Sequence, residues 1–174
     1  LHGKSGADMQ EMLAAVIAWG TGKAAALLAA REGARVALVN RSAERAEALR
    51  DEIAAEGGEA MVFAGDVVKA ADMDAMAAAV EARFGRIDAL CNNVGGSRGR
   101  SGSATALDEA DWDQTIDLNL KSAMLASRAC IPAMRRAGGG AIVNISSVVG
   151  AMGLMSATGA AAYASAKAGL HGLT

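Results

Sequence analysis

Ile142–Ser147 reads IVNISS, and Ala161–Leu170 reads AAYASAKAGL. The first segment is an apolar run that predicts a buried strand ending in serine, and the second has the alanine-rich composition of a helix. Tyr163 and Lys167 are four residues apart, which places them on one face of that helix. The stretch therefore brings a serine, a tyrosine and a lysine to neighbouring elements.

These three residue types together suit one kind of chemistry. A free phenol has a pKa of about 10, and an ammonium close to it favours the phenolate and lowers that pKa. A tyrosine with such a neighbour can act as a general acid or base. A serine hydroxyl at the end of the adjacent strand can stabilise charge on the same reacting oxygen. The pattern predicts proton transfer to or from an alcohol or carbonyl oxygen, although Tyr-x-x-x-Lys alone also describes a surface pair without chemistry.

Two further motifs stand upstream in a matching order. Residues 91–95 read CNNVG and residues 118–121 read LNLK. From about Gly22 onward, the chain resembles the short-chain dehydrogenase/reductase family in all of these motifs. The resemblance implies a Rossmann-type fold and an NAD(P)-dependent oxidoreductase that transfers a hydride between the nicotinamide and a secondary alcohol or ketone.

The resemblance also implies four catalytic residues. Ser147 matches the serine that orients the substrate, and Tyr163 matches the acid/base residue. Lys167 matches the lysine that tunes this tyrosine and hydrogen-bonds the nicotinamide ribose. Asn119 matches the residue that holds a water for proton relay. A strand-end serine and a helix-kink asparagine are the structural alternatives for Ser147 and Asn119.

Several cofactor contacts are implied at the ends of the predicted strands. In members that prefer NAD, an acid at the end of the second strand binds the ribose 2′-hydroxyl. Asn40 occupies that place here and Arg41 follows it, so a guanidinium suited to a 2′-phosphate favours NADP(H), with NAD(H) possible and a solvated turn arginine as the alternative. The implied cofactor-binding set is Gly20, Gly22, Asn40, Arg41, Asp66, Val67, Asn92, Asn93, Gly95, Tyr163 and Lys167.

Residues 1–22 depart from the family pattern. A strand and a Thr-Gly-x-x-x-Gly-x-Gly turn are expected there, but counting back from Gly20-Thr21-Gly22 puts the first glycine on Val16 and the threonine on Ala15. The composition of the preceding residues favours a helix over a clear strand. A β-branched residue in place of a turn glycine hinders close approach of a cofactor. We therefore expect this turn to be degenerate, or its sequence to be misrecorded.

The rest of the chain alternates between the two kinds of element. We expect helices at residues 23–32, 42–56 and 71–84 and one long helix that begins at Thr105 or Asp108 and runs through Asn119 to residue 136. Strands are expected at residues 35–40, 59–64, 87–91 and 141–145. This alternation predicts an α/β fold with a doubly wound parallel sheet in three α/β/α layers, and one NAD(P)-binding domain over residues 1–174.

The family continues beyond the tyrosine-bearing helix with two more strands. By that comparison we expect the C-terminal part to be missing, either because the sequence lacks part of the molecule or because the chain is a truncated relative. A truncated, non-catalytic protein that does not bind nucleotide productively is the alternative to an active enzyme.

Composition excludes several functional classes. The 17 basic and 19 acidic residues give a net charge of −2 and are dispersed, so no nucleic-acid surface is expected. The apolar run at residues 12–19 is too short to span a membrane. Cys91 and Cys130 lack metal-site spacing and suit a reducing compartment, and no metal site is expected. We expect a cytoplasmic protein with a small-molecule alcohol or ketone substrate, and the family resemblance implies a homo-oligomer, either a dimer or a tetramer.

Overall fold

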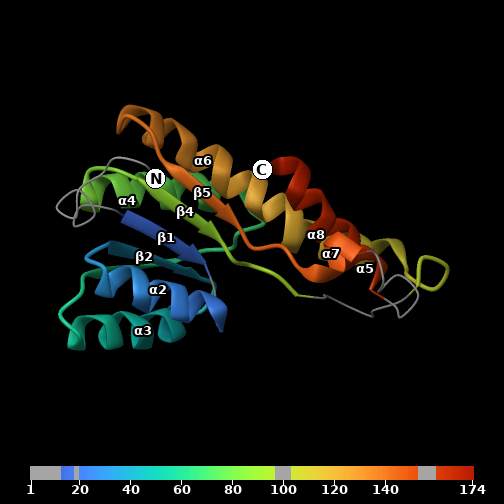
Figure 1. Cartoon of the computed structure of the whole chain (residues 1–174), viewed down its shortest axis with the longest axis horizontal. Coiled ribbons are helices and arrows are strands. Elements are labelled where there is room, and N and C mark those ends of the chain that lie inside the picture. The colour runs from blue at the N-terminus through green and yellow to red at the C-terminus, as the bar shows by residue number, and fades with distance from the viewer. Residues whose placement is uncertain (1–12, 18–19, 97–102, 153–159) are drawn as a thin grey trace.

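The fold is built on a five-stranded parallel sheet (Figure 1). The computed structural model describes residues 13–17, 20–96, 103–152 and 160–174. The strands follow the spatial order β3-β2-β1-β4-β5, so the first described strand lies in the middle of the sheet, the next two lead to one edge, and the last two lie on the other side. The predicted doubly wound α/β sheet is thereby confirmed. The strands are β1 (Leu13–Ile17), β2 (Arg35–Asn40), β3 (Ala60–Ala64), β4 (Ala89–Asn92) and β5 (Ala141–Asn144).

The central strand β1 corrects the sequence prediction for the first 22 residues. These residues were expected to lack a clear strand, yet residues 13–17 pair in parallel with both neighbours, with Val16 opposite Leu38 of β2 and Cys91 of β4. Strands at the centre of a parallel sheet read as continuous apolar runs without alternation, which a short run shares with a helix. Pairing with β2 and β4 therefore makes this segment a strand, although its own sequence does not distinguish a strand from a helix.

Helices cover both faces of the sheet (Figure 1). Helices α2 and α3 lie on one face, and α4 and α6 lie on the other. Strand β2 contributes to both interiors: Val36 and Leu38 pack with α2 and α3, whereas Val39 packs with α4 and β4. The three predicted layers are therefore present. The helices are α2 (Thr21–Arg31), α3 (Ala43–Ala55), α4 (Ala70–Phe84), α5 (Glu109–Ile116), α6 (Ser122–Arg136), α7 (Val148–Met152) and α8 (Ala161–Leu173).

The predicted long helix over residues 105–136 is interrupted. It begins after Asp108, whose side chain accepts a hydrogen bond from the Asp111 amide at 2.8 Å. Between α5 and α6 the backbone widens into a π-helical turn, η1 (Asp117–Lys121), which contains the buried Asn119. Such turns occur mostly as single insertions and often at functional sites. Within the described residues, no helix is long and apolar enough to cross a membrane.

Candidate active site

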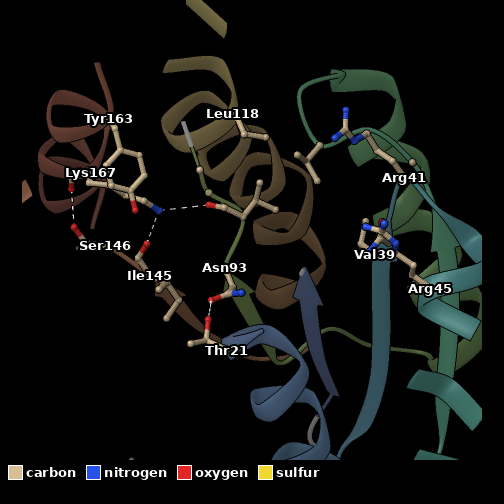
Figure 2. Close-up of a pocket in the computed structure, with 16 residues that line it drawn as sticks. Thr21, Val39, Arg41, Arg45, Asn93, Leu118, Ile145, Ser146, Tyr163 and Lys167 are labelled. Carbon is tan, nitrogen blue, oxygen red and sulfur yellow. Dashed lines mark hydrogen bonds between the residues drawn. The ribbon is translucent and has the colours of Figure 1, made fainter. Parts of the chain in front are cut away.

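A cavity of about 600 Å³ opens at the carboxyl ends of the strands. In open α/β sheets, ligands bind at this edge, where the strand order reverses. Figure 2 shows Tyr163 and Lys167 at one end of the cavity and Arg41 and Arg45 at the other, with Thr21 and Asn93 between them. The remaining lining residues are Val39, Asn40, Gly65, Val67, Val94, Gly95, Gly96, Leu118, Ile145 and Ser146.

Lys167 is held at the first end of the cavity by backbone carbonyls. Its Nζ donates to the carbonyl oxygen of Ile145 at 2.8 Å and to that of Val94 at 3.4 Å. The same Nζ lies 5.7 Å from the centroid of the Tyr163 ring. The side chain is 3% exposed, and this burial lowers the pKa of Lys167 below its ordinary value. The geometry thus places a fixed cationic group beside the phenol.

Asn119, in the π-helical turn, is not among the residues that line the cavity, but it is buried and hydrogen-bonded to Gly96 of the lining. Its Nδ2 donates to the carbonyl oxygens of Gly96 at 2.7 Å and Thr115 at 2.8 Å, and its Oδ1 accepts from the Gly96 amide at 3.0 Å. The neighbouring Gly95 leaves space for both polar groups. A Cβ on Gly95 would lie 2.8 Å from Lys167 Nζ and 2.9 Å from Asn119 Oδ1. The close approach of both side chains to position 95 therefore favours glycine there.

The two serines after β5 differ in their surroundings. Ser146 lines the cavity, and its hydroxyl donates to the carbonyl oxygen of Lys167 at 2.7 Å. Ser147, the predicted catalytic serine, is absent from the residues that line the cavity. Its hydroxyl accepts from the Val149 amide at 3.3 Å at the start of α7, a helix that the sequence did not predict.

The second end of the cavity is cationic. Arg41 and Arg45 line it together with the predicted ligand Asn40, whose Oδ1 accepts from the Ser42 amide at 3.0 Å. Among the described residues that line the cavity, none is a carboxylate, and the cations are Arg41, Arg45 and Lys167. An anionic ligand that spans both ends fits this distribution of charge.

The predicted cofactor-binding residues Asp66 and Val67 divide between two spaces. Val67 lines the main cavity. Asp66 lines a smaller adjoining cavity of about 120 Å³, which it shares with Arg41, and one of its carboxylate oxygens accepts from the Val68 amide at 3.3 Å. The two spaces therefore meet at Arg41.

Asn92, the last residue of β4, and Asn93, which follows it, point in different directions. The Oδ1 of Asn93 accepts from the Thr21 hydroxyl at 2.8 Å, within the cavity lining. Asn92 was predicted to bind the cofactor, but its amide turns away from the cavity and donates to Asn144 Oδ1 at 2.8 Å and Ser127 Oγ at 3.2 Å. Alternate residues of a strand face opposite sides, so Asn92 fastens β4 to β5 and α6 instead.

The predicted glycine turn is described only in part, because residues 18 and 19 lie outside the described residues. Gly20 has a φ of +79° and immediately precedes α2, a conformation that glycine adopts readily and other residues rarely do. Gly22 is buried in the first turn of α2, and Thr21, the first residue of that helix, lines the cavity. A helix N-terminus at this place favours an anion such as a pyrophosphate.

These features fit a nicotinamide dinucleotide. The volume lies within the range of about 300–1,000 Å³ that is usual for cofactor sites. The N-terminus of α2 lies between the arginine end and the tyrosine–lysine end of the cavity. A nicotinamide dinucleotide has the matching order of groups: the ribose of its adenosine half, the pyrophosphate, and the nicotinamide.

Nine residues of the lining were not predicted as site residues, and three of them have polar side chains: Thr21, Arg45 and Ser146. Thr21 stands between the two recognised glycines, and Ser146 directly precedes a recognised serine, so both had a signal in their neighbours. Arg45 faces the cavity only because α3 begins at residue 43, which sets the direction of its third residue. No group of three or more His, Cys, Asp or Glu side chains in the described ranges could hold a metal ion.

Comparison with known proteins gives one consistent family. Residues 14–174 match the family model described as short chain dehydrogenase. The chain is 40% identical over 156 residues to the 3-oxoacyl-(acyl-carrier-protein) reductase of Staphylococcus aureus, covering 89% of this chain and 61% of that protein. It is 41% identical over 155 residues to D-threitol dehydrogenase of Mycolicibacterium smegmatis, covering 89% and 58% respectively. The chain thus spans about three fifths of these curated relatives.

A solved structure is similar over most of the fold. A metagenomic short-chain oxidoreductase in complex with NADP superimposes with a TM-score of 0.82 and 38% sequence identity, covering 94% of this chain and 73% of that one. Both the topology and the sequence therefore resemble those of proteins from one family.

Proposed function

This chain belongs to the short chain dehydrogenase family, and we propose that its cavity serves the NADP(H)-dependent interconversion of a secondary alcohol and a ketone. One observation carries the proposal. Tyr163 and the buried Lys167 stand at one end of a cavity lined by no carboxylate among the described residues, and two arginines stand at the other end.

The chain's own residues have distinct tasks in this reaction. During reduction, the Tyr163 hydroxyl donates its proton to the carbonyl oxygen of the substrate, and during oxidation it accepts the proton back. Lys167 stabilises the resulting phenolate from its position 5.7 Å from the ring centroid. From the family resemblance we assign Ser147 to orienting the substrate oxygen and Asn119 to proton supply. Neither residue is among those that line the cavity, and Asn119 is held beside Gly96 of the lining. When bound, the nicotinamide supplies or accepts the hydride.

Preference for NADP(H) is part of the proposal. Arg41 and Arg45 offer guanidinium groups, which pair with phosphate in a bidentate manner. No acid lines this end among the described residues, so a ribose 2′-hydroxyl would lack the carboxylate that usually binds it. The structural relative in complex with NADP supports this choice.

The substrate class stays broad. The similar proteins are named for a 3-oxoacyl-carrier-protein, for D-threitol and, at 37% identity in Mediterraneibacter gnavus, for a 3β-hydroxysteroid. Their common chemistry is a secondary alcohol or its ketone, and this class is the one that we propose here.

The oligomeric state and cellular location are proposals drawn from the family. We propose a homo-oligomer in the cytoplasm that uses the exposed face of α5 and α6, where Trp112 is 38% and Met124 is 40% exposed. Light scattering after size exclusion tests this assembly, and Met124→Glu should shift the chain to the monomer mass. A monomer before substitution would contradict it.

Titration with NADPH and then NADH, followed by cofactor fluorescence, tests the proposed function first. Saturable binding with NADPH tighter is expected. Loss of NADPH absorbance at 340 nm with a panel of small ketones, a steroid ketone and a 3-oxoacyl thioester then tests turnover. A folded chain that binds neither cofactor would contradict the proposal.

A further inference from the structure

Lys167 is held at both its backbone and its side chain by the segment that follows β5. The Ser146 hydroxyl donates to the backbone carbonyl oxygen of Lys167 at 2.7 Å. The Lys167 Nζ donates back to the carbonyl oxygen of Ile145, the preceding residue, at 2.8 Å. Figure 2 shows both hydrogen bonds. Two consecutive residues after β5 thus hold the backbone and the side chain of the same lysine.

The bond from Ser146 reaches an interior position of α8. Carbonyl groups inside a helix already accept from the amide four residues later, so the Ser146 hydroxyl is a second donor to this carbonyl and comes from outside the helix. Gly150 of α7 permits the two elements to approach at this point. A Cβ on Gly150 would lie 2.6 Å from both the carbonyl carbon of Lys167 and the amide nitrogen of Ala168.

This anchor bears on where the ammonium lies. A lysine side chain has four rotatable bonds, and ordering it is opposed by conformational entropy. When the backbone at position 167 is held, only the side-chain bonds remain to be ordered for Nζ to reach the Ile145 carbonyl. Tyr163 lies one turn earlier on the same helix, so the same anchor also fixes the position of the phenol.

We propose that Ser146 is a positioning residue whose hydroxyl fixes α8 at Lys167 and thereby keeps Nζ beside the Tyr163 ring. The inference rests on the proposed function for its effect on turnover. It gives Ser146 a task separate from that of Ser147, whose hydroxyl accepts from the Val149 amide.

Trace acetylation of the cofactor-free chain tests the proposal directly. Acetic anhydride reacts with accessible neutral amines, and mass spectrometry of peptides separates the buried Lys167 from the exposed Lys69, which serves as the internal standard. In Ser146→Ala we expect the Lys167 rate, relative to Lys69, to rise about threefold or more, as loss of one hydrogen bond would allow. Ser165→Ala, an exposed serine of α8, is the matched control and should leave the rate unchanged.

Ser146→Thr separates the hydroxyl from packing. This variant retains the donor, so the slow Lys167 rate should return. An unchanged Lys167 rate in Ser146→Ala overturns the proposal. Failure of Ser146→Thr, folded as wild type by circular dichroism, to restore the slow rate also overturns it, because the effect would then come from packing.

Kinetics supply the second measurement. With NADPH and a ketone that the wild type reduces, Ser146→Ala should lower kcat about three- to tenfold, as loss of one hydrogen bond supports. The KM for the ketone should stay within about twofold, because substrate contacts are retained. An unchanged kcat would count against the proposal. If the wild type reduces no ketone, the proposed function fails, while the acetylation rates still decide the role of Ser146.

Discussion

Lys167 Nζ lies 5.7 Å from the centroid of the Tyr163 ring, and the Ile145 carbonyl holds it there at 2.8 Å. The lysine reaches this position from one helical turn beyond the tyrosine, as the four-residue spacing predicts. Because the side chain is buried, its charge is weakly screened by solvent.

Replacing Tyr163 with Phe should reduce turnover by at least about a hundredfold, since a positioned proton donor contributes 10²–10⁴-fold. The ring remains, so NADPH affinity and folding should be retained. Loss of NADPH absorbance measures the first effect, and fluorescence titration with circular dichroism measures the others. Turnover equal to that of the wild type would remove Tyr163 from the mechanism.

Replacing Lys167 with Met should make the stability difference from wild type depend on pH. Burial lowers the pKa of Lys167 from 10.5 in the folded state. Between the folded and unfolded pKa values, the unfolded wild type binds more protons, so its stability rises with pH relative to the variant. Urea unfolding at intervals from pH 7 to pH 10 measures the difference. If the difference in unfolding free energy between wild type and variant stays constant with pH, or if the variant gains stability relative to wild type as pH rises, this assignment is wrong.

Replacing Gly95 with Ala should destabilise the fold by about 1–3 kcal/mol, as overpacking does. The new Cβ would press on Lys167 Nζ and Asn119 Oδ1. NADPH affinity should fall as well, because Gly95 lines the cavity. Gly172→Ala is the matched control, since a Cβ there meets nothing within 4 Å. Equal unfolding free energies for the two variants would show that the lysine and asparagine side chains relax freely.

Replacing Arg41 or Arg45 with Ala should weaken NADPH binding about tenfold or more, as expected for loss of a hydrogen bond between charged groups. NADH affinity should change little, because NADH lacks the 2′-phosphate. The control is Arg50→Ala, an arginine of α3 that pairs with Asp51 outside the cavity lining. Parallel fluorescence titrations with both cofactors give the selectivity. An equal loss for NADPH and NADH would assign these arginines to a general electrostatic role.

The sequence alone predicted most of the strands. The prediction failed where contacts with distant residues determine the secondary structure. Strand β2 was predicted at its observed bounds because its apolar run is flanked by clear turn residues. Strand β1 was missed because an isolated apolar run of five residues has no period that separates strand from helix. The π-helical turn was missed because its cause is tertiary: Asn119 bonds to Gly96, far away in sequence.

The candidate site shows the same division. Tyr163 and Lys167 are brought to one cavity because their spacing lies within a single helix. Asn92 and Asn93 are adjacent in sequence, yet only Asn93 lines the cavity, since the strand sends alternate side chains to opposite faces. Arg45 and Ser146 were not predicted, because which side chain of α3 faces the cavity and how closely α7 approaches α8 are set by tertiary packing.

The central place of β1 has a consequence for how the chain is made. Its two partners are β2, which follows soon after, and β4, which pairs through Cys91 with Val16 across a long intervening segment. During synthesis, one edge of β1 stays without a partner until β4 leaves the ribosome. An unpaired apolar strand edge invites association with other chains. Until β4 has emerged, the nascent chain is therefore exposed to such association through β1.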